Sequence, residues 1–137
     1  MRKRTRAREL ALQVLYQIDI TQDNCDASLE NFWKTQEDPV GEEIKDFTAR
    51  LVKGVVENLQ PIDDKISGYA TNWQLERMAV VDRNIMRMAG FELIFRDDIP
   101  PKVAINEAVE LAKKYSGVEA ARFVNGILDK IKLETGK

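Results

Sequence analysis

The sequence predicts an all-α fold, a compact helical bundle of about seven helices in two subdomains. Apolar side chains recur at spacings of three and four residues along almost the whole 137-residue chain, which is the period of a helix. Breaks that contain proline or glycine divide this pattern into segments of helical length. The chain has no convincing pair of strands. Its one hairpin-like dipeptide, Asn125-Gly126, lies inside sustained helical spacing, so we assign it to a helix.

Three helices are expected in the first half of the chain. A helix over 2–20 carries a single apolar stripe, and the polar segment 21–27 then forms a loop. A short helix follows through 29–33, and the sequence Asp-Pro-Val-Gly at 38–41 is a strong break. A third helix spans 44–59, where apolar residues again recur at helical spacing.

Further helices are expected in the second half. Pro61 suits the first turn of one of them, because a helix leaves its first N–H groups unpaired. Segment 78–95 is apolar around most of its circumference, which predicts the central buried helix. Residues 97–101 end it and begin the next helix, and a last helix runs through 124–131. The inward side chains of the helix after residue 101 are expected to be Val103, Ala104, Ala108, Leu111, Ala112 and Tyr115.

Gly90 and Gly126 lie inside two of these predicted helices. Glycine in a helix interior costs up to about 1 kcal/mol relative to alanine, so its presence needs a reason. A second helix that approaches closely leaves no room for a Cβ atom. We therefore expect a close helix approach at both positions.

Composition places the chain among soluble, single-domain proteins. Apolar residues make up 44% and charged residues 32%, and 137 residues suffice for one domain. We expect its two subdomains, about 1–60 and about 61–137, to meet near Pro61. No apolar run approaches the ~20 residues that span a bilayer, and no secretory signal pattern is expected. The single cysteine, Cys25, fits a reducing cytoplasm.

Residue types needed for catalysis are scarce. The chain has no histidine, which is the commonest general base and metal ligand near neutral pH. One cysteine without histidine provides neither a thiol dyad nor a zinc cluster, and the seven glycines are scattered singly. The paired acids at 63–64 and 97–98 adjoin a proline turn or a helix start, where carboxylates are favoured for structural reasons. We therefore expect a protein that is not an enzyme and uses no metal or cofactor.

A basic arm (residues 2–8) precedes the first acid of the chain, and its cations are Arg2, Lys3, Arg4, Arg6 and Arg8. Five of the 21 basic residues lie there, so the other 16 face 23 acids and the remainder carries about −7. Cations at a helix N-terminus oppose the helix dipole, and they also repel one another. An external polyanion removes both penalties. This favours nucleic acid as the partner over a membrane surface, an acidic protein or a solubilising tail.

One edge of the first helix combines this charge with an aromatic ring. Arg4, Arg8, Leu12 and Tyr16 follow one another at four-residue spacing, and about 12 Å separates Arg8 from Tyr16 at ~1.5 Å per residue. Guanidinium groups bind phosphates and an aromatic ring stacks on a base, as in single-stranded RNA sites. A core position for Tyr16 is the alternative.

A series of short segments stands in a fixed order along the chain: RARE at 6–9, ALQ at 11–13, LY at 15–16, VDRNI at 81–85, FEL at 91–93, DIP at 98–100, AINEAVELAK at 104–113 and FVNGIL at 123–128. This ordered series resembles the NusB family of bacterial transcription antitermination factors. The resemblance covers essentially the whole chain, and its most specific part runs from Asp82 to Leu128.

The resemblance implies an all-helical fold of two subdomains with three to four helices each. It implies binding to the boxA element of nascent ribosomal RNA transcripts. The implied protein partner is NusE, a ribosomal protein of the small subunit that also acts in the RNA polymerase antitermination complex. The family includes monomers and homodimers, and the resemblance implies no role at a membrane.

The family's functional positions transfer to this sequence one by one. The implied RNA-binding residues are Arg4, Arg6, Arg8, Tyr16, Glu76, Arg87, Glu119 and Phe123. The implied contacts with the protein partner are Asp82 and Ile85. Phe123 lies beside the apolar stripe of the last helix, so an edge position suits it, with core packing as the alternative. Asp82 has two alternatives, a helix cap or an ion pair with Arg83 or Arg87.

Two other functions remain open from the sequence. Some RNA methyltransferases carry a related RNA-recognition segment, but 137 residues leave no room beside the bundle for a cofactor-binding α/β domain. A stand-alone oligomerisation module is the second, and self-association without RNA affinity would distinguish it. The basic arm and the ordered segments favour an RNA-binding adaptor, which is the function that we expect.

Overall fold

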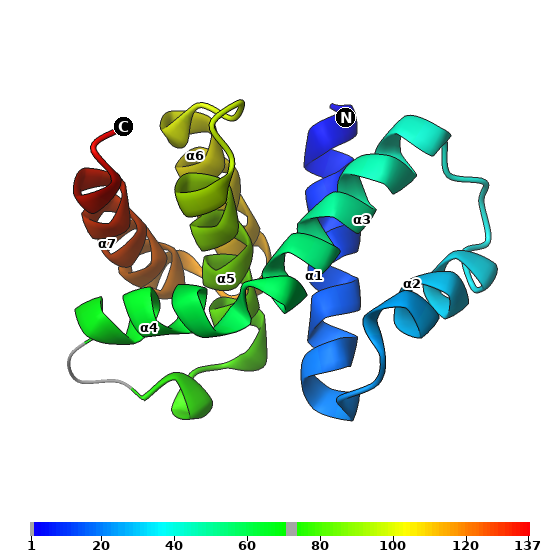
Figure 1. Ribbon diagram of the computed structural model, residues 1–137, viewed down its shortest axis with the longest axis horizontal. Coiled ribbons are helices and arrows are strands. Elements are labelled where there is room, and N and C mark those ends of the chain that lie inside the picture. Colours follow the sequence, from blue (N-terminus) through cyan, green and yellow to red (C-terminus); the bar gives the residue numbers. More distant parts are fainter. Residues whose placement is uncertain (1, 71–73) are drawn as a thin grey trace. The chain divides into compact units, whose positions relative to one another are not determined.

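The computed structural model describes residues 2–70 and 74–137, and it confirms the all-α prediction (Figure 1). Within these ranges the chain forms seven α-helices and one short 3₁₀ helix, with no strand. The hairpin-like dipeptide Asn125-Gly126 lies inside a helix, as expected. The helices fall into two compact units, Met1–Glu57 and Asn58–Lys137.

The first unit consists of three helices, α1 (Lys3–Thr21), α2 (Cys25–Lys34) and α3 (Glu42–Glu57). α3 crosses α1 and packs on it, and α2 packs on both (Figure 1). Asn24 caps α2, because its Oδ1 accepts a hydrogen bond from the Ala27 backbone N–H at 3.1 Å. The loop before α2 is therefore shorter than predicted. Buried Thr48 donates from Oγ1 to the Ala7 carbonyl oxygen at 3.2 Å, which joins α3 to α1.

The second unit contains α4 (Leu59–Tyr69), the 3₁₀ helix η1 (Leu75–Arg77), α5 (Val80–Phe95), α6 (Pro101–Tyr115) and α7 (Val118–Thr135). α5 packs against α4, α6 and α7 (Figure 1), and nearly every residue from 84 to 93 is buried. The prediction of a central buried helix is thus confirmed, although the helix begins two residues later than expected. Pro61 lies in the first turn of α4, as predicted.

The predicted close approach is confirmed at Gly90 and wrong at Gly126. A Cβ atom on Gly90 would lie 3.2 Å from Cγ2 of Ile62, because α4 packs closely on α5 there. Nothing lies within 4 Å of the same position on Gly126, which is exposed on α7. Two inward positions of α6 are also wrong, since Val103 is 42% exposed and Tyr115 is 46% exposed. Both lie in terminal turns of α6, where neighbouring side chains cover less of a helix.

We expect Gly126→Ala to stabilise the protein by about 0.5–1 kcal/mol, because alanine loses less backbone entropy in a helix. The added methyl group meets no other atom, so nothing opposes this gain. The midpoint of thermal unfolding should rise by about 2–5 °C. Gly90→Ala is the matched control, because its Cβ would press on Ile62 and offset the gain. Circular-dichroism melts measure both variants, and a midpoint for Gly126→Ala at or below that of the wild type contradicts this prediction.

Candidate nucleic-acid interface

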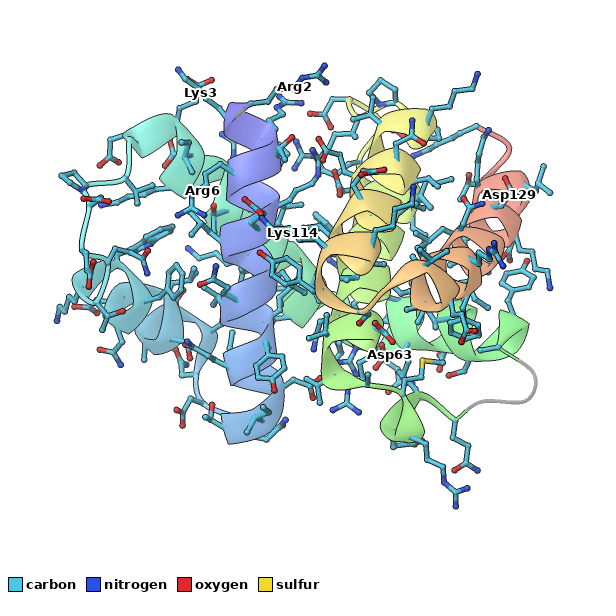
Figure 2. The ribbon with its side chains drawn as sticks, turned by 180° about the vertical axis from the view of Figure 1, so that it is seen from behind. Arg2, Lys3, Arg6, Asp63, Lys114 and Asp129 are labelled. Atoms are coloured by element: carbon cyan, nitrogen blue, oxygen red, sulfur yellow. The ribbon has the colours of Figure 1, made fainter. Side chains whose placement is uncertain are left out.

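The basic arm (residues 2–8) belongs to an ordered helix. α1 begins at Lys3, and the Arg6 backbone N–H donates to the Arg2 carbonyl oxygen at 3.0 Å. The first turn of α1 holds no acidic residue, and no side chain caps it. Figure 2 shows Arg2, Lys3 and Arg6 toward this end of α1. The positive end of the helix dipole therefore coincides with a cluster of cations, and the alternative of a frayed tail is excluded.

Two arginines of the arm, Arg4 and Arg6, keep their guanidinium groups at the surface. Arg4 is exposed, and its guanidinium carbon Cζ lies 4.8 Å from the centre of the Phe47 ring on α3. Arg6 is partly exposed, and its Nη1 lies 3.8 Å from Oε1 of Glu9, beyond hydrogen-bonding distance. Both cations can therefore approach a ligand from solvent.

Arg8 does not lie on the exposed edge where the sequence placed it. Only 1% of Arg8 is exposed, and its Cζ lies 5.3 Å from the centre of the Phe47 ring. A guanidinium over an aromatic face is stabilised by the ring's electrostatic field. The outer-edge position predicted for Arg8 is therefore wrong, because α1 is buried on more sides than its single apolar stripe indicated, and its predicted phosphate contact stays a prediction. Arg8 instead stabilises the packing of α1 on α3.

The other end of the predicted edge, at Tyr16, is open. Leu12 is buried, whereas Tyr16 is 38% exposed. The alternative of a core position for Tyr16 is thus excluded. Its ring remains available to stack on a base, about two turns of α1 beyond the buried Arg8.

A groove of about 400 Å³ in the second unit brings together three predicted residues, Asp82, Glu119 and Phe123. Phe123 is partly exposed and forms part of the groove wall. An aromatic ring and two carboxylates on one concave surface can bind the face and the edge of an unstacked base. The residues that line the groove are Arg77, Met78, Ala79, Asp82, Ser116, Glu119, Ala120 and Phe123.

The two residues predicted for a protein partner differ in exposure. Asp82 is partly exposed, and its Oδ1 accepts a hydrogen bond from Ser116 Oγ at 2.5 Å. This bond joins the start of α5 to the end of α6. Ile85 is 0% exposed, because it lies on a side of α5 that packs against neighbouring helices. The partner contact predicted for Ile85 stays a prediction, although its side chain is covered here, and Asp82 is a candidate that also lines the groove.

Arg87 is held by a two-point ion pair with Asp63 of α4. Its Nε and one terminal nitrogen donate to the two carboxylate oxygens of Asp63 at 2.8 and 3.0 Å. Its Nη1 also donates to Oδ1 of Asn84 at 3.4 Å. The side chain is mostly buried, so Arg87 joins α5 to α4 and a phosphate would have to compete with Asp63 for it.

Glu76 is exposed on η1, beside the groove-lining Arg77. The position of η1 is fixed from α5, because Arg83 Nη1 donates to the carbonyl oxygens of Leu75 and Glu76 at 3.4 and 3.3 Å. Nothing in the spacing of the sequence indicated that Arg83 holds this turn. Glu76 thus has a defined backbone position and an open carboxylate.

The described ranges, 2–70 and 74–137, contain no group of three His, Cys, Asp or Glu side chains that could hold a metal ion. No helix in the same ranges is long and apolar enough to cross a membrane. Burial, with a smaller contribution from the charge of Asp26, raises the pKa of the Cys25 thiol. The thiol is therefore protonated at neutral pH and is a weak nucleophile.

Comparison with known proteins gives a match over nearly the whole chain. The model of the NusB family matches residues 5–132. The transcription antitermination protein NusB of Anaeromyxobacter sp. (strain Fw109-5) is 54% identical over 129 residues, which cover 94% of this chain and 89% of that protein.

Solved structures show the same fold. The structure of NusB from T. maritima has a TM-score of 0.85 and 39% identity, and the match covers 96% of this chain and 91% of that chain. A chain in a crystal structure of antitermination factors NusB and NusE in complex with double-stranded RNA has a TM-score of 0.88 and 29% identity. That match covers 98% of both chains.

Proposed function

The chain belongs to the NusB family, and from that membership we propose that it is an RNA-binding transcription antitermination factor. Its mechanism is binding without catalysis. One surface holds the phosphates of single-stranded RNA, a second reads unstacked bases, and the bound RNA is presented to a protein partner. The RNA is the boxA element of nascent ribosomal RNA transcripts, and the complex supports processive transcription in the cytoplasm.

The observation that carries this proposal is the pair of exposed guanidinium groups, Arg4 and Arg6, on the first turns of an ordered helix. Their charges oppose the dipole of α1, and the first turn contains no acid to compensate them. The rest of the chain is acidic, so the arm is the one part of the sequence with a strong excess of positive charge. A bound phosphate chain supplies the negative charge that this helix end lacks.

The groove of the second unit supplies recognition of bases. Glu119 is negatively charged and would repel phosphates, so its oxygens suit the amino groups on base edges. The Phe123 ring supplies a stacking surface in the same groove. Glu76, on the turn beside the groove, offers a further acceptor.

The proposed protein partner is NusE. A solved structure with 29% identity to this chain contains NusB and NusE with double-stranded RNA, which supports this choice. Asp82 is the candidate contact, through the carboxylate oxygen that Ser116 leaves open. The protein itself acts as a monomer or a homodimer.

A fluorescence-anisotropy titration tests the proposed function. The fluorescent probes are a boxA RNA and a scrambled RNA of the same length and composition, each at several salt concentrations. We expect tighter binding to boxA at every salt concentration, because bases are read in addition to phosphates. Equal affinities for the two RNAs would show that the protein binds polyanions without sequence specificity. Self-association without affinity for either RNA would instead identify an oligomerisation module.

A further inference from the structure

A small cavity lies between α1 and α3 in the first unit. Its volume is about 170 Å³, and α1 contributes Lys3 and Arg4 to its wall. The residues that α3 contributes are Glu43, Asp46, Phe47 and Arg50. One water molecule occupies about 30 Å³ in the liquid, so the cavity has room for a phosphate group. Arg50 lies in the predicted third helix, and no motif of the sequence gave it a role.

Two of the six side chains neutralise each other. Lys3 Nζ donates to Glu43 Oε2 at 2.8 Å. This hydrogen bond, with the attraction between the two charges, raises the pKa of Lys3 and lowers the pKa of Glu43. Both groups therefore stay charged at neutral pH and form an ion pair with no net charge. The charges of the cavity that remain are those of Arg4, Arg50 and Asp46.

Arg4 is oriented by an aromatic ring. Its Cζ lies 4.8 Å from the centre of the Phe47 ring, which is itself buried. A guanidinium that lies over an aromatic ring is attracted by the ring and keeps its N–H groups for other acceptors. The ring thus restricts the rotamers of Arg4 and leaves its donors for an anion, which lowers the entropy cost of binding.

Arg50 is exposed, and it has no hydrogen bond or ion pair with any residue of 2–70 or 74–137. Asp46 is one turn earlier on α3 and lines the same cavity. An Asp–Arg pair at this spacing on an exposed helix face is only a weak attraction. Two arginines therefore face a phosphate-sized cavity with a single acid between them.

We propose that Arg4 and Arg50 form a phosphate-binding subsite, so that the RNA backbone contacts α3 as well as the basic arm. This inference rests on the proposed function. The guanidinium groups of Arg4 and Arg50 donate to the non-bridging oxygens of one phosphodiester, in the two-point geometry that arginine favours. The negative charge of Asp46 repels the same phosphate, which limits the affinity of the subsite.

The test compares three variants with the wild type in the boxA titration over a range of salt concentrations. Arg50→Ala should weaken binding roughly three- to tenfold at low salt, as expected for the loss of one typical hydrogen bond by an exposed side chain. It should also make the slope of log K against log salt less negative, by at most about 0.7, the contribution of one single-strand phosphate, because Arg4 still contacts the same phosphate. Asp46→Asn should strengthen binding. Lys53→Ala removes an exposed cation of the same helix outside the cavity and should change neither quantity.

The outcomes separate the two proposals. Opposite effects of Arg50→Ala and Asp46→Asn, with Lys53→Ala unchanged, support the subsite. Wild-type affinity and slope in Arg50→Ala overturn the subsite and leave the proposed function intact. Equal losses of affinity in Arg50→Ala and Lys53→Ala also overturn the subsite. They would show that the RNA responds only to the overall positive charge of α3. A wild-type protein that binds neither RNA overturns the proposed function and the subsite together.

Discussion

Replacing Phe123 by alanine weakens binding to boxA RNA by about 1–3 kcal/mol, which is a loss of roughly 5- to 150-fold in affinity. The ring lies in the wall of the groove that also holds Asp82 and Glu119, and it is partly exposed. Stacking on a base uses the face of the ring, so alanine removes the contact completely. The salt dependence should stay unchanged, because no phosphate contact is lost.

Two further variants test whether the effect of Phe123→Ala comes from loss of its ring in the groove. Phe123→Tyr keeps the ring and should keep most of the affinity. Phe95→Ala removes another partly open ring, at the end of α5 and outside the groove, and should leave RNA binding unchanged. A thermal melt accompanies each titration. If Phe123→Ala loses RNA binding only in step with its folded fraction, the residue is a packing residue and the stacking role is refuted.

The double variant Arg4→Ala, Arg6→Ala lowers affinity for boxA and for scrambled RNA alike, by at least tenfold at low salt. The slope of log K against log salt should become less negative by about 1.4, since each phosphate contact on a single strand contributes about 0.7. This pattern is the reverse of that expected for Phe123→Ala. The reason is that phosphates carry no sequence information, whereas stacked and hydrogen-bonded bases do.

The control for the arm removes two other exposed cations of the first unit, in the double variant Lys34→Ala, Lys53→Ala. Both lysines form ion pairs within the unit and lie outside the arm. Equal losses of affinity in the two double variants would show that net charge alone attracts the RNA. Arg8→Ala gives a further contrast, because the buried Arg8 lies over Phe47 and its loss should lower the melting midpoint.

The helices could be predicted from the sequence because burial follows the helical period. The apolar stripe of α3 and the apolar residues around most of α5 are local patterns, and breaks that contain proline separate several of the helices. The predictions that were wrong depend on how the helices pack against one another. Whether Gly126 meets a neighbour, or whether Val103 is covered, depends on what packs against that turn, and the period does not contain this information.

In the candidate site, too, some positions could be predicted from local sequence and others depended on how the helices pack. Charge and the resemblance to the NusB family pointed to Arg4, Arg6 and Phe123, which the structure leaves at least partly exposed. The helical period placed Arg8 beside Arg4 on an outer edge, but α3 covers that edge with Phe47.

Other contacts of the site join residues far apart in the chain. Arg87 meets Asp63 across 24 residues, and Ser116 meets Asp82 across 34. No spacing rule within one helix predicts such pairs, so they appear only once the helices are packed.

The most direct test of the central claim is the affinity for boxA and scrambled RNA, measured by anisotropy with and without saturating NusE. We predict that the wild-type protein prefers boxA on its own and that NusE increases its affinity for boxA, because the candidate NusE contact, Asp82, lines the groove in which we propose that bases are read, so the two ligands lie side by side. The linkage is reciprocal, so boxA should tighten the complex with NusE by the same factor. Affinities that are equal for the two RNAs and unchanged by NusE would contradict the proposal that this protein recognises boxA together with NusE.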